Sequence, residues 1–245
     1  MLILKPHIFN SYPEIIFGFS PRFVNGSKPP FYFNLSFTVG DDKDTVNKNR
    51  EKFFNSLGLS TKNVSYQHQI HEDSISITNE GGYCGESDAL ITTKQELGLA
   101  ISTADCTPIF IYDPVKKIIA AVHSGWRGTE KKILNKTIDK LKTEYDSSVT
   151  DMIVYIGPSI SQVNYEVGIE VAEKFDSKYS VKNKHKYLLD VSGINYDLLL
   201  NAGVQKNNIQ FSKLCSFEMS ELFHSYRRDG KNSGRSFGVI AMKAE

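Results

Sequence analysis

The residue of this chain that offers the most chemistry is Cys106, in the segment Thr103–Pro108, which has histidines both before and after it in the sequence. His71 lies upstream and His123 lies downstream. A thiolate and two imidazoles suit Zn²⁺, and three protein ligands leave a fourth coordination position open for water or substrate. The same residues could instead form a cysteine nucleophile with a histidine base. The residue types alone leave both chemistries open.

The second histidine of such a site is not fixed by spacing. His68 precedes His71 by three residues, and on a β-strand these two side chains would face opposite sides, so only one of them can join Cys106. His123 ends an apolar stretch and leads into Gly-Trp-Arg-Gly, a setting that favours a ligand. Cys84 is the spare candidate, and a fourth protein ligand there would make the zinc structural and not catalytic.

The elements around these residues are predicted from apolar runs. Short strands are expected over 97–102, 109–112 and 118–122, with Asp113-Pro114 as a turn between the last two. Cys106 and His123 would then lie at strand ends, where binding sites are commonly built. Apolar residues at steps of three and four predict an amphipathic helix over 134–145. Its expected start near Gly128-Thr129 offers free N–H groups that attract anions.

The rest of the chain mixes strands and helices without strict alternation. Further strands are expected over 152–156, 188–191 and 237–242, helices over 167–175, 194–202 and 217–227, and loops over 25–30 and 79–87. This mixture predicts an α+β (mixed α/β) fold rather than a doubly wound sheet. The length is that of one large domain, and we expect residues 1–245 to form a single catalytic domain.

Composition excludes several classes of protein. A net charge of +1 lacks the basic excess of a nucleic-acid-binding surface, and we interpret the basic run 182–186 as a solvated loop. No apolar stretch approaches the roughly 18 residues of a transmembrane helix, and the start does not resemble a signal peptide. Three cysteines are too few for a disulfide framework. We therefore expect a cytoplasmic enzyme, monomer or homodimer, with no nucleic-acid or membrane partner.

Taken together, several motifs resemble one known family. They are Gln69-Ile70-His71, Ser87–Thr92, Thr103–Pro108, Ala121–Gly128, Ile156–Ile160 with Tyr165–Gly168, and Phe223–Gly230. The resemblance runs from about Asn34 to the C-terminus. The family that the chain resembles is the single-domain family described as purine nucleoside phosphorylase, multicopper polyphenol oxidase (laccase domain) or peptidoglycan-editing factor. Its fold is similar to that of deamidating-toxin cysteine hydrolases.

The resemblance implies a catalytic zinc bound by His71, Cys106 and His123, with copper as the alternative metal. It also implies phosphorolysis of adenosine, inosine, guanosine and methylthioadenosine, and deamination of adenosine. The small-molecule partners would then be purine nucleosides and phosphate. Three places depart from the family pattern: Ser159 and Val163-Asn164 stand where many members have cysteines, and Ser87 stands where a glycine usually precedes Asp88.

Roles for the remaining residues follow from this chemistry. Deamination needs a proton shuttle, for which Asp88 is the candidate, while Asp105 is expected to orient a histidine ligand. Phosphorolysis needs a phosphate site, for which we choose Arg50 and Arg127 over Arg227, Arg228 and Arg235. We also expect Asn34 to bind substrate and Trp126 or Tyr83 to stack on the purine. Asp88, Cys106 and Arg127 are thus the expected catalytic residues.

Three other functions compete with this interpretation. A cysteine amidase would use Cys106 as a free thiolate and His123 as its base. A multicopper oxidase is disfavoured because six histidines without a His-X-His pair do not supply several copper sites. Editing of peptidoglycan precursors remains open as the physiological role.

Overall fold

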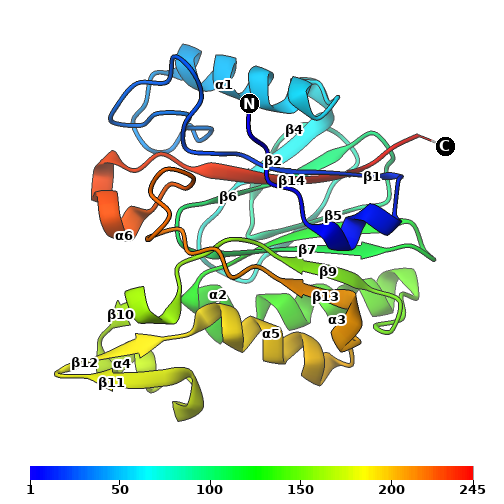
Figure 1. Ribbon diagram of the computed structural model, residues 1–245. Coiled ribbons are helices and arrows are strands. Elements are labelled where there is room, and N and C mark those ends of the chain that lie inside the picture. Colours follow the sequence, from blue (N-terminus) through cyan, green and yellow to red (C-terminus); the bar gives the residue numbers. More distant parts are fainter. Residues whose placement is uncertain (245) are drawn as a thin grey trace.

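Two β-sheets stack face to face, with helices on both outer faces (Figure 1). This computed structural model describes residues 1–244. The five-stranded sheet has the order β1 (Ile15–Phe19), β14 (Ser236–Met242), β6 (Gly98–Thr103), β2 (Val64–His68) and β4 (Gly82–Glu86). The six-stranded sheet has the order β13 (Ile209–Phe211), β9 (Ile153–Ile156), β7 (Thr107–Asp113), β8 (Ile118–Ser124), β5 (Ala89–Thr92) and β3 (Ile75–Ile77). The mixed α+β class predicted from the sequence is confirmed.

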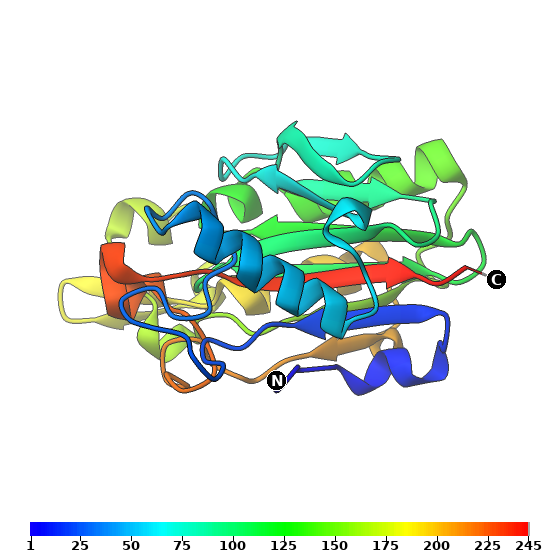
Figure 2. The same cartoon turned by 90° about the horizontal axis from the view of Figure 1, so that it is seen from above.

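Helices cover the outer face of each sheet. Helix α1 (Lys43–Ser56) packs Phe53 and Phe54 against the five-stranded sheet, and Figure 2 shows it lying across that sheet. Helices α3 (Ile133–Tyr145) and α5 (Val191–Ala202) cover the six-stranded sheet. The short helices are α2 (Trp126–Glu130), α4 (Ile169–Ala172) and α6 (Tyr226–Asp229).

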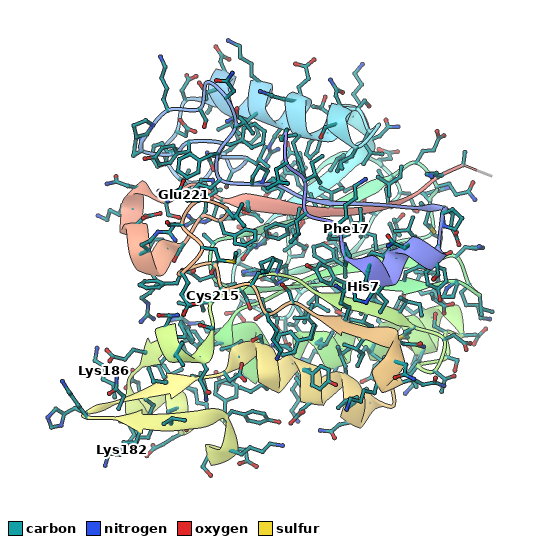
Figure 3. The ribbon with its side chains drawn as sticks, viewed as in Figure 1. His7, Phe17, Lys182, Lys186, Cys215 and Glu221 are labelled. Atoms are coloured by element: carbon teal, nitrogen blue, oxygen red, sulfur yellow. The ribbon has the colours of Figure 1, made fainter. Side chains whose placement is uncertain are left out.

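The inner strands of the six-stranded sheet, β9, β7, β8 and β5, are buried on both faces, which explains their continuous apolar runs. Along β8, Ile118, Ala120 and Val122 face the helices. Ile119 and Ala121 face the other sheet. The space between the sheets is filled by aromatic rings, including Phe17 (labelled in Figure 3), Phe110 and Tyr155. This packing holds the strand ends that carry the site in fixed positions.

A small third sheet projects from one corner. Its order is β10 (Glu166–Val167), β12 (Lys186–Leu189) and β11 (Ser180–Asn183). Figure 3 shows Lys182 and Lys186 at its outer tip, and both are exposed. The basic run 182–186 is therefore the solvated end of a hairpin rather than a loop alone.

Most predicted elements are present. The strands expected over 97–102, 109–112, 118–122, 152–156 and 237–242 are confirmed. The helix expected over 194–202 is also confirmed and ends at Gly203, whose φ of 100° is left-handed. Residues 134–145 are helical as well, but Lys132, with φ of 60°, separates α3 from α2. The strand expected over 188–191 ends earlier, because Val191 begins α5.

Three expectations need correction, and one helix was not predicted. The helix expected over 217–227 does not form, because the Arg228 guanidinium donates hydrogen bonds to the carbonyl oxygens of Ser216, Phe217 and Phe223 and holds the segment in turns. The loop expected over 79–87 contains β4, and the helix expected over 167–175 is reduced to α4 after β10. Helix α1 has no counterpart in the prediction.

None of the helices within residues 1–244 combines the length and the apolar character needed to cross a membrane.

Candidate metal centre

His71, Cys106 and His123 meet at one end of the sheet stack. Their ligand atoms all lie within 4.8 Å of one another, and the two imidazole rings are nearly perpendicular with centroids 4.9 Å apart. His71 lies three residues after β2, Cys106 is in the turn from β6 to β7, and His123 is near the end of β8. Over residues 1–244, this is the only group of three or more such side chains close enough to share one ion.

The turn that carries Cys106 is held in an unusual conformation. Asp105 has φ of 98°, a left-handed value that costs free energy for a residue other than glycine. Its carboxylate accepts hydrogen bonds from the Ser216 hydroxyl and the Arg227 backbone N–H, both at 2.7 Å. The Thr103 hydroxyl donates to the Cys106 carbonyl at 2.6 Å. These contacts fix the direction of the thiol. Asp105 thus supports the cysteine and not, as expected, a histidine.

The residue that orients both histidines is Asp88, which is fully buried. Its carboxylate lies 2.8 Å from His123 Nδ1, so the other ring nitrogen is free to face Cys106. The same carboxylate accepts backbone N–H groups of residues 70, 71 and 72 at 2.8–3.2 Å. Burial raises the pKa of Asp88, but these donors outweigh burial and lower it. A carboxylate behind a histidine ligand is typical of metal sites.

The electrostatics of the cluster favour the ionised form of the thiol. Burial raises the pKa of Cys106, but the imidazoles of His123 and His71 outweigh burial and lower it. Burial by itself would lower the pKa of His123. The negative charges of the Cys106 thiolate and the Asp88 carboxylate outweigh burial, so the pKa of His123 is raised. Metal ligands must be deprotonated at sulfur. The donor set of one thiolate and two imidazoles therefore fits a cation such as Zn²⁺.

Gly125, the first residue of Gly-Trp-Arg-Gly, allows the backbone to approach the cluster. A Cβ atom at this position would lie 3.0 Å from the Cys106 Sγ and 3.5 Å from the His71 Cδ2. A larger residue would crowd the Cys106 sulfur and would contact the His71 ring. Cys84, by contrast, lies apart from the cluster and donates its thiol to the Tyr66 carbonyl at 3.1 Å. It is not a fourth ligand.

A cavity of about 360 Å³ opens onto the three ligands. Its other lining residues are mostly neutral and polar: Ser36, Thr38, Gln67, His68, Gln69, Ser102, Thr103, Ala104, Tyr226 and Arg235. Of the residues that the structure describes, no aspartate or glutamate lines it. The cavity therefore combines a metal-ligand cluster with one arginine and suits a ligand that carries negative charge.

Two residues expected to bind substrate lie behind the cavity wall. Arg50 is buried, donates from Nε to the Leu35 carbonyl, and lies 4.1 Å from the ring centres of both Phe37 and Tyr66. Burial lowers its pKa to about 10. The Asn34 side chain accepts the backbone N–H groups of Ser36 and Arg235, both at 3.0 Å. Asn34 thus positions two residues of the cavity without lining it.

The other expected residues follow Gly125 at the start of α2. Arg127 is exposed and lies over the Trp126 ring at 4.4 Å. Trp126 packs against the apolar cluster under the small third sheet. Neither residue lines the cavity. His68, which the resemblance sets aside, does line it, and pairs with Glu86 at 3.6 Å.

Sequence reasoning passed over Arg235, Tyr226 and Gln67. Arg235 lies two residues before the start of the predicted strand 237–242, and that position beside a strand end was the one available signal. Tyr226 is 53% exposed at the cavity rim, and Arg235 lies 5.5 Å from its ring centre. Gln67 is on β2, in line with the segment that carries His71.

Comparison with known proteins identifies the family. The family model described as multi-copper polyphenol oxidoreductase laccase matches residues 16–243. The chain belongs to this family. A purine nucleoside phosphorylase of Clostridium acetobutylicum is 37% identical over 215 residues, covering 86% of this chain and 87% of that protein. The purine nucleoside phosphorylase YlmD of Bacillus subtilis is 30% identical, with 94% and 89% covered.

Solved structures of the family share the whole fold. The crystal structure of the hypothetical protein YfiH of Bacillus licheniformis matches with a TM-score of 0.93 at 28% identity, covering 98% of this chain and 96% of that one. YlmD of Geobacillus stearothermophilus matches with a TM-score of 0.91 at 26% identity, covering 95% and 93%. The resemblance inferred from the motifs is therefore confirmed at the level of family and fold.

The contacts of Asp88 predict its effect on metal binding. Asp88→Asn keeps the side-chain shape but removes the charge that faces His123, so we expect zinc affinity to fall about 10–100-fold. Competition titration with a chromophoric chelator measures this. Asp197→Asn, which breaks a surface contact to Lys178, is the control and should leave affinity unchanged. An unaltered affinity in Asp88→Asn would show that this carboxylate does not support the ligands.

Proposed function

We propose that this chain is a zinc-dependent purine nucleoside phosphorylase, with the metal held by His71, Cys106 and His123. One observation carries the proposal. The metal-ligand cluster opens onto a cavity with an arginine and no carboxylate, in a chain 37% identical to a protein of that name. The cavity volume is within the roughly 300–1,000 Å³ of small-molecule sites. Copper is the alternative metal for this donor set.

The reaction sets requirements that the lining residues can be tested against. A phosphate oxygen forms a bond to C1′ of the ribose while the bond from C1′ to the purine nitrogen breaks. The electron pair of that bond leaves with the base, which takes up a proton. The site must therefore hold phosphate, hold the base and supply a proton.

Arg235 is the residue that we assign to phosphate. Its Nη1 is held by the carbonyl oxygens of Ser233 and Gly234, at 2.8 and 3.0 Å, which leaves the rest of the guanidinium fork for a ligand. It forms no ion pair with any residue in the described range 1–244. A guanidinium group commonly binds a phosphate through two parallel N–H···O hydrogen bonds. Arg127, chosen from the sequence, is the competing assignment.

We assign the two other requirements, holding the base and supplying a proton, to Tyr226 and His68. The exposed Tyr226 ring at the rim offers a surface on which a purine can stack. His68 is the one lining imidazole outside the metal cluster, and it is our candidate for giving the leaving base its proton. When bound, Zn²⁺ would supply Lewis-acid polarisation beside these groups.

Deamination of adenosine, which the resemblance also implies, has weaker support. It needs a group that carries a proton to the leaving ammonia. The Asp88 carboxylate is fully buried and already accepts hydrogen bonds from His123 and three backbone N–H groups. We therefore assign Asp88 to orientation of the ligands, and the proton transfer would fall to His68.

The competing functions meet specific difficulties. Multicopper oxidation needs several copper sites, and the described residues hold one cluster of this kind. The cysteine amidase needs a free thiolate, which a bound metal would occupy. The three cysteines of the described chain are all unpaired.

The central experiment is incubation of the zinc-loaded protein with inosine plus phosphate, and separately with adenosine alone. We expect hypoxanthine and ribose 1-phosphate from the first mixture. Cys106→Ala should lose zinc and reduce the rate by at least about 100-fold, because the metal loses its sulfur ligand. Absence of ribose 1-phosphate with the metal-loaded wild type would refute the proposal.

The phosphate assignment predicts a difference between two arginines. Arg235→Gln should raise the KM for phosphate about tenfold or more, because a charge-assisted pair of hydrogen bonds is lost. Arg127→Gln, outside the cavity, should change it less than about twofold. Steady-state kinetics at varied phosphate measure both. The reverse pattern would return the phosphate site to Arg127.

Alkylation separates a metal ligand from a nucleophile. In metal-free protein, iodoacetamide should modify Cys106 in preference to Cys84, because the imidazoles lower the pKa of Cys106 and burial raises that of Cys84. Bound zinc should protect Cys106, with peptide mass spectrometry as the readout. Equal labelling with and without zinc would show that the sulfur is not a ligand and would favour the amidase.

A further inference from the structure

Gln67 is a buried side chain whose amide has no partner. It is 9% exposed and lines the cavity beside the metal ligands. Within residues 1–244, neither its Oε1 nor its Nε2 has a hydrogen-bond partner. Burying an amide without hydrogen bonds is costly, and buried polar side chains in proteins are nearly always paired. A partner from outside the chain is therefore expected at this amide.

The backbone around Gln67 is irregular at the same point. Strand β2 pairs with β4 at Tyr66 and again at His68, but the register shifts between them. The extra residue lies on β4, where Gly85 has φ of 88°. On its other side, β2 pairs with β6 only at Val64 and Ser65. Bulges of this kind re-aim side chains and are frequent beside active sites.

A second glutamine on the same segment, Gln69, has a structural role and serves as a comparison for Gln67. Gln69 also lines the cavity, but its amide is fully used. Its Nε2 donates to the Ser102 carbonyl and its Oε1 accepts the Ser102 N–H, both at 2.7 Å. Gln69 thus joins β2 to β6 where their backbone pairing has stopped. Gln67 makes no such bond, so the fold does not explain its amide.

We propose that the Gln67 amide forms hydrogen bonds with the purine base at positions 1 and 6. This proposal rests on the proposed function. Its amide offers a donor and an acceptor side by side. In inosine that edge presents an N–H donor and a carbonyl acceptor. In adenosine it presents a ring-nitrogen acceptor and an amino donor. Turning the amide by 180° exchanges its oxygen and nitrogen, so one glutamine matches both bases.

Ligand binding tests this assignment independently of turnover. Calorimetry on the zinc-loaded protein without phosphate compares inosine, adenosine and purine riboside, which lacks the group at position 6. The wild type should bind inosine and adenosine about tenfold more tightly than purine riboside, because the analogue loses the hydrogen bond at position 6 and keeps only the N1 acceptor. Gln67→Met should bring the three dissociation constants to within about twofold. Gln69→Met, the matched control, should keep the wild-type ratios even if binding weakens overall.

Each outcome separates the assignment from the proposed reaction. If ribose 1-phosphate is formed but Gln67→Met keeps the wild-type ratios, an ordered water satisfies the amide and only the assignment is overturned. The same holds if the ratio of inosine to 2′-deoxyinosine changes instead, since Gln67 would then read the sugar. A Gln67-dependent preference without phosphorolysis would overturn only the reaction. Failure of the wild type to bind any of the nucleosides would overturn both.

Discussion

The arrangement of the whole site depends on one buried carboxylate, that of Asp88. It accepts three consecutive backbone N–H groups from the segment that carries His71 and lies 2.8 Å from the His123 ring. The backbone N–H of His123 also donates to the Asp88 carbonyl at 2.7 Å. Without this carboxylate, three part-buried backbone donors would lose their acceptor, at up to about 1–3 kcal/mol for each. The left-handed backbone at His71 persists because these bonds outweigh its strain.

The fold was predictable where local pattern and burial agree. Strands β7 and β8 are buried on both faces, so their apolar runs identify them without ambiguity. Helix α1 was missed because its buried face has only four residues in fourteen, Val46, Arg50, Phe53 and Phe54, one of which is charged. The helix expected over 217–227 failed for the opposite reason. Its local pattern is sound, but the carbonyl contacts of Arg228 override it.

The site was predictable only as far as the motifs reach. The motifs supplied the three ligands, since each stands in a distinctive local sequence. The cavity is formed by residues 36–38, by β2, by the end of β6, by Tyr226 of α6 and by Arg235 just before β14, and no local pattern relates these segments. Gln67 was therefore not a candidate before the fold was known, and Arg235 was considered but could not be preferred over the other arginines. Asp88 was expected to shuttle a proton, but its contacts are those of a residue that orients the histidines, and sequence spacing does not encode such contacts.

The three ligands belong to different parts of the sandwich. His71 follows a strand of the five-stranded sheet, His123 is on a strand of the six-stranded sheet, and Cys106 is in the turn that connects the two. A cation held by all three would join the layers as a disulfide cross-link would, and its binding free energy would add to the free energy of unfolding. Resistance to heat would then follow the concentration of free metal. The same ion that serves chemistry at the cavity would decide how firmly the two sheets stay together.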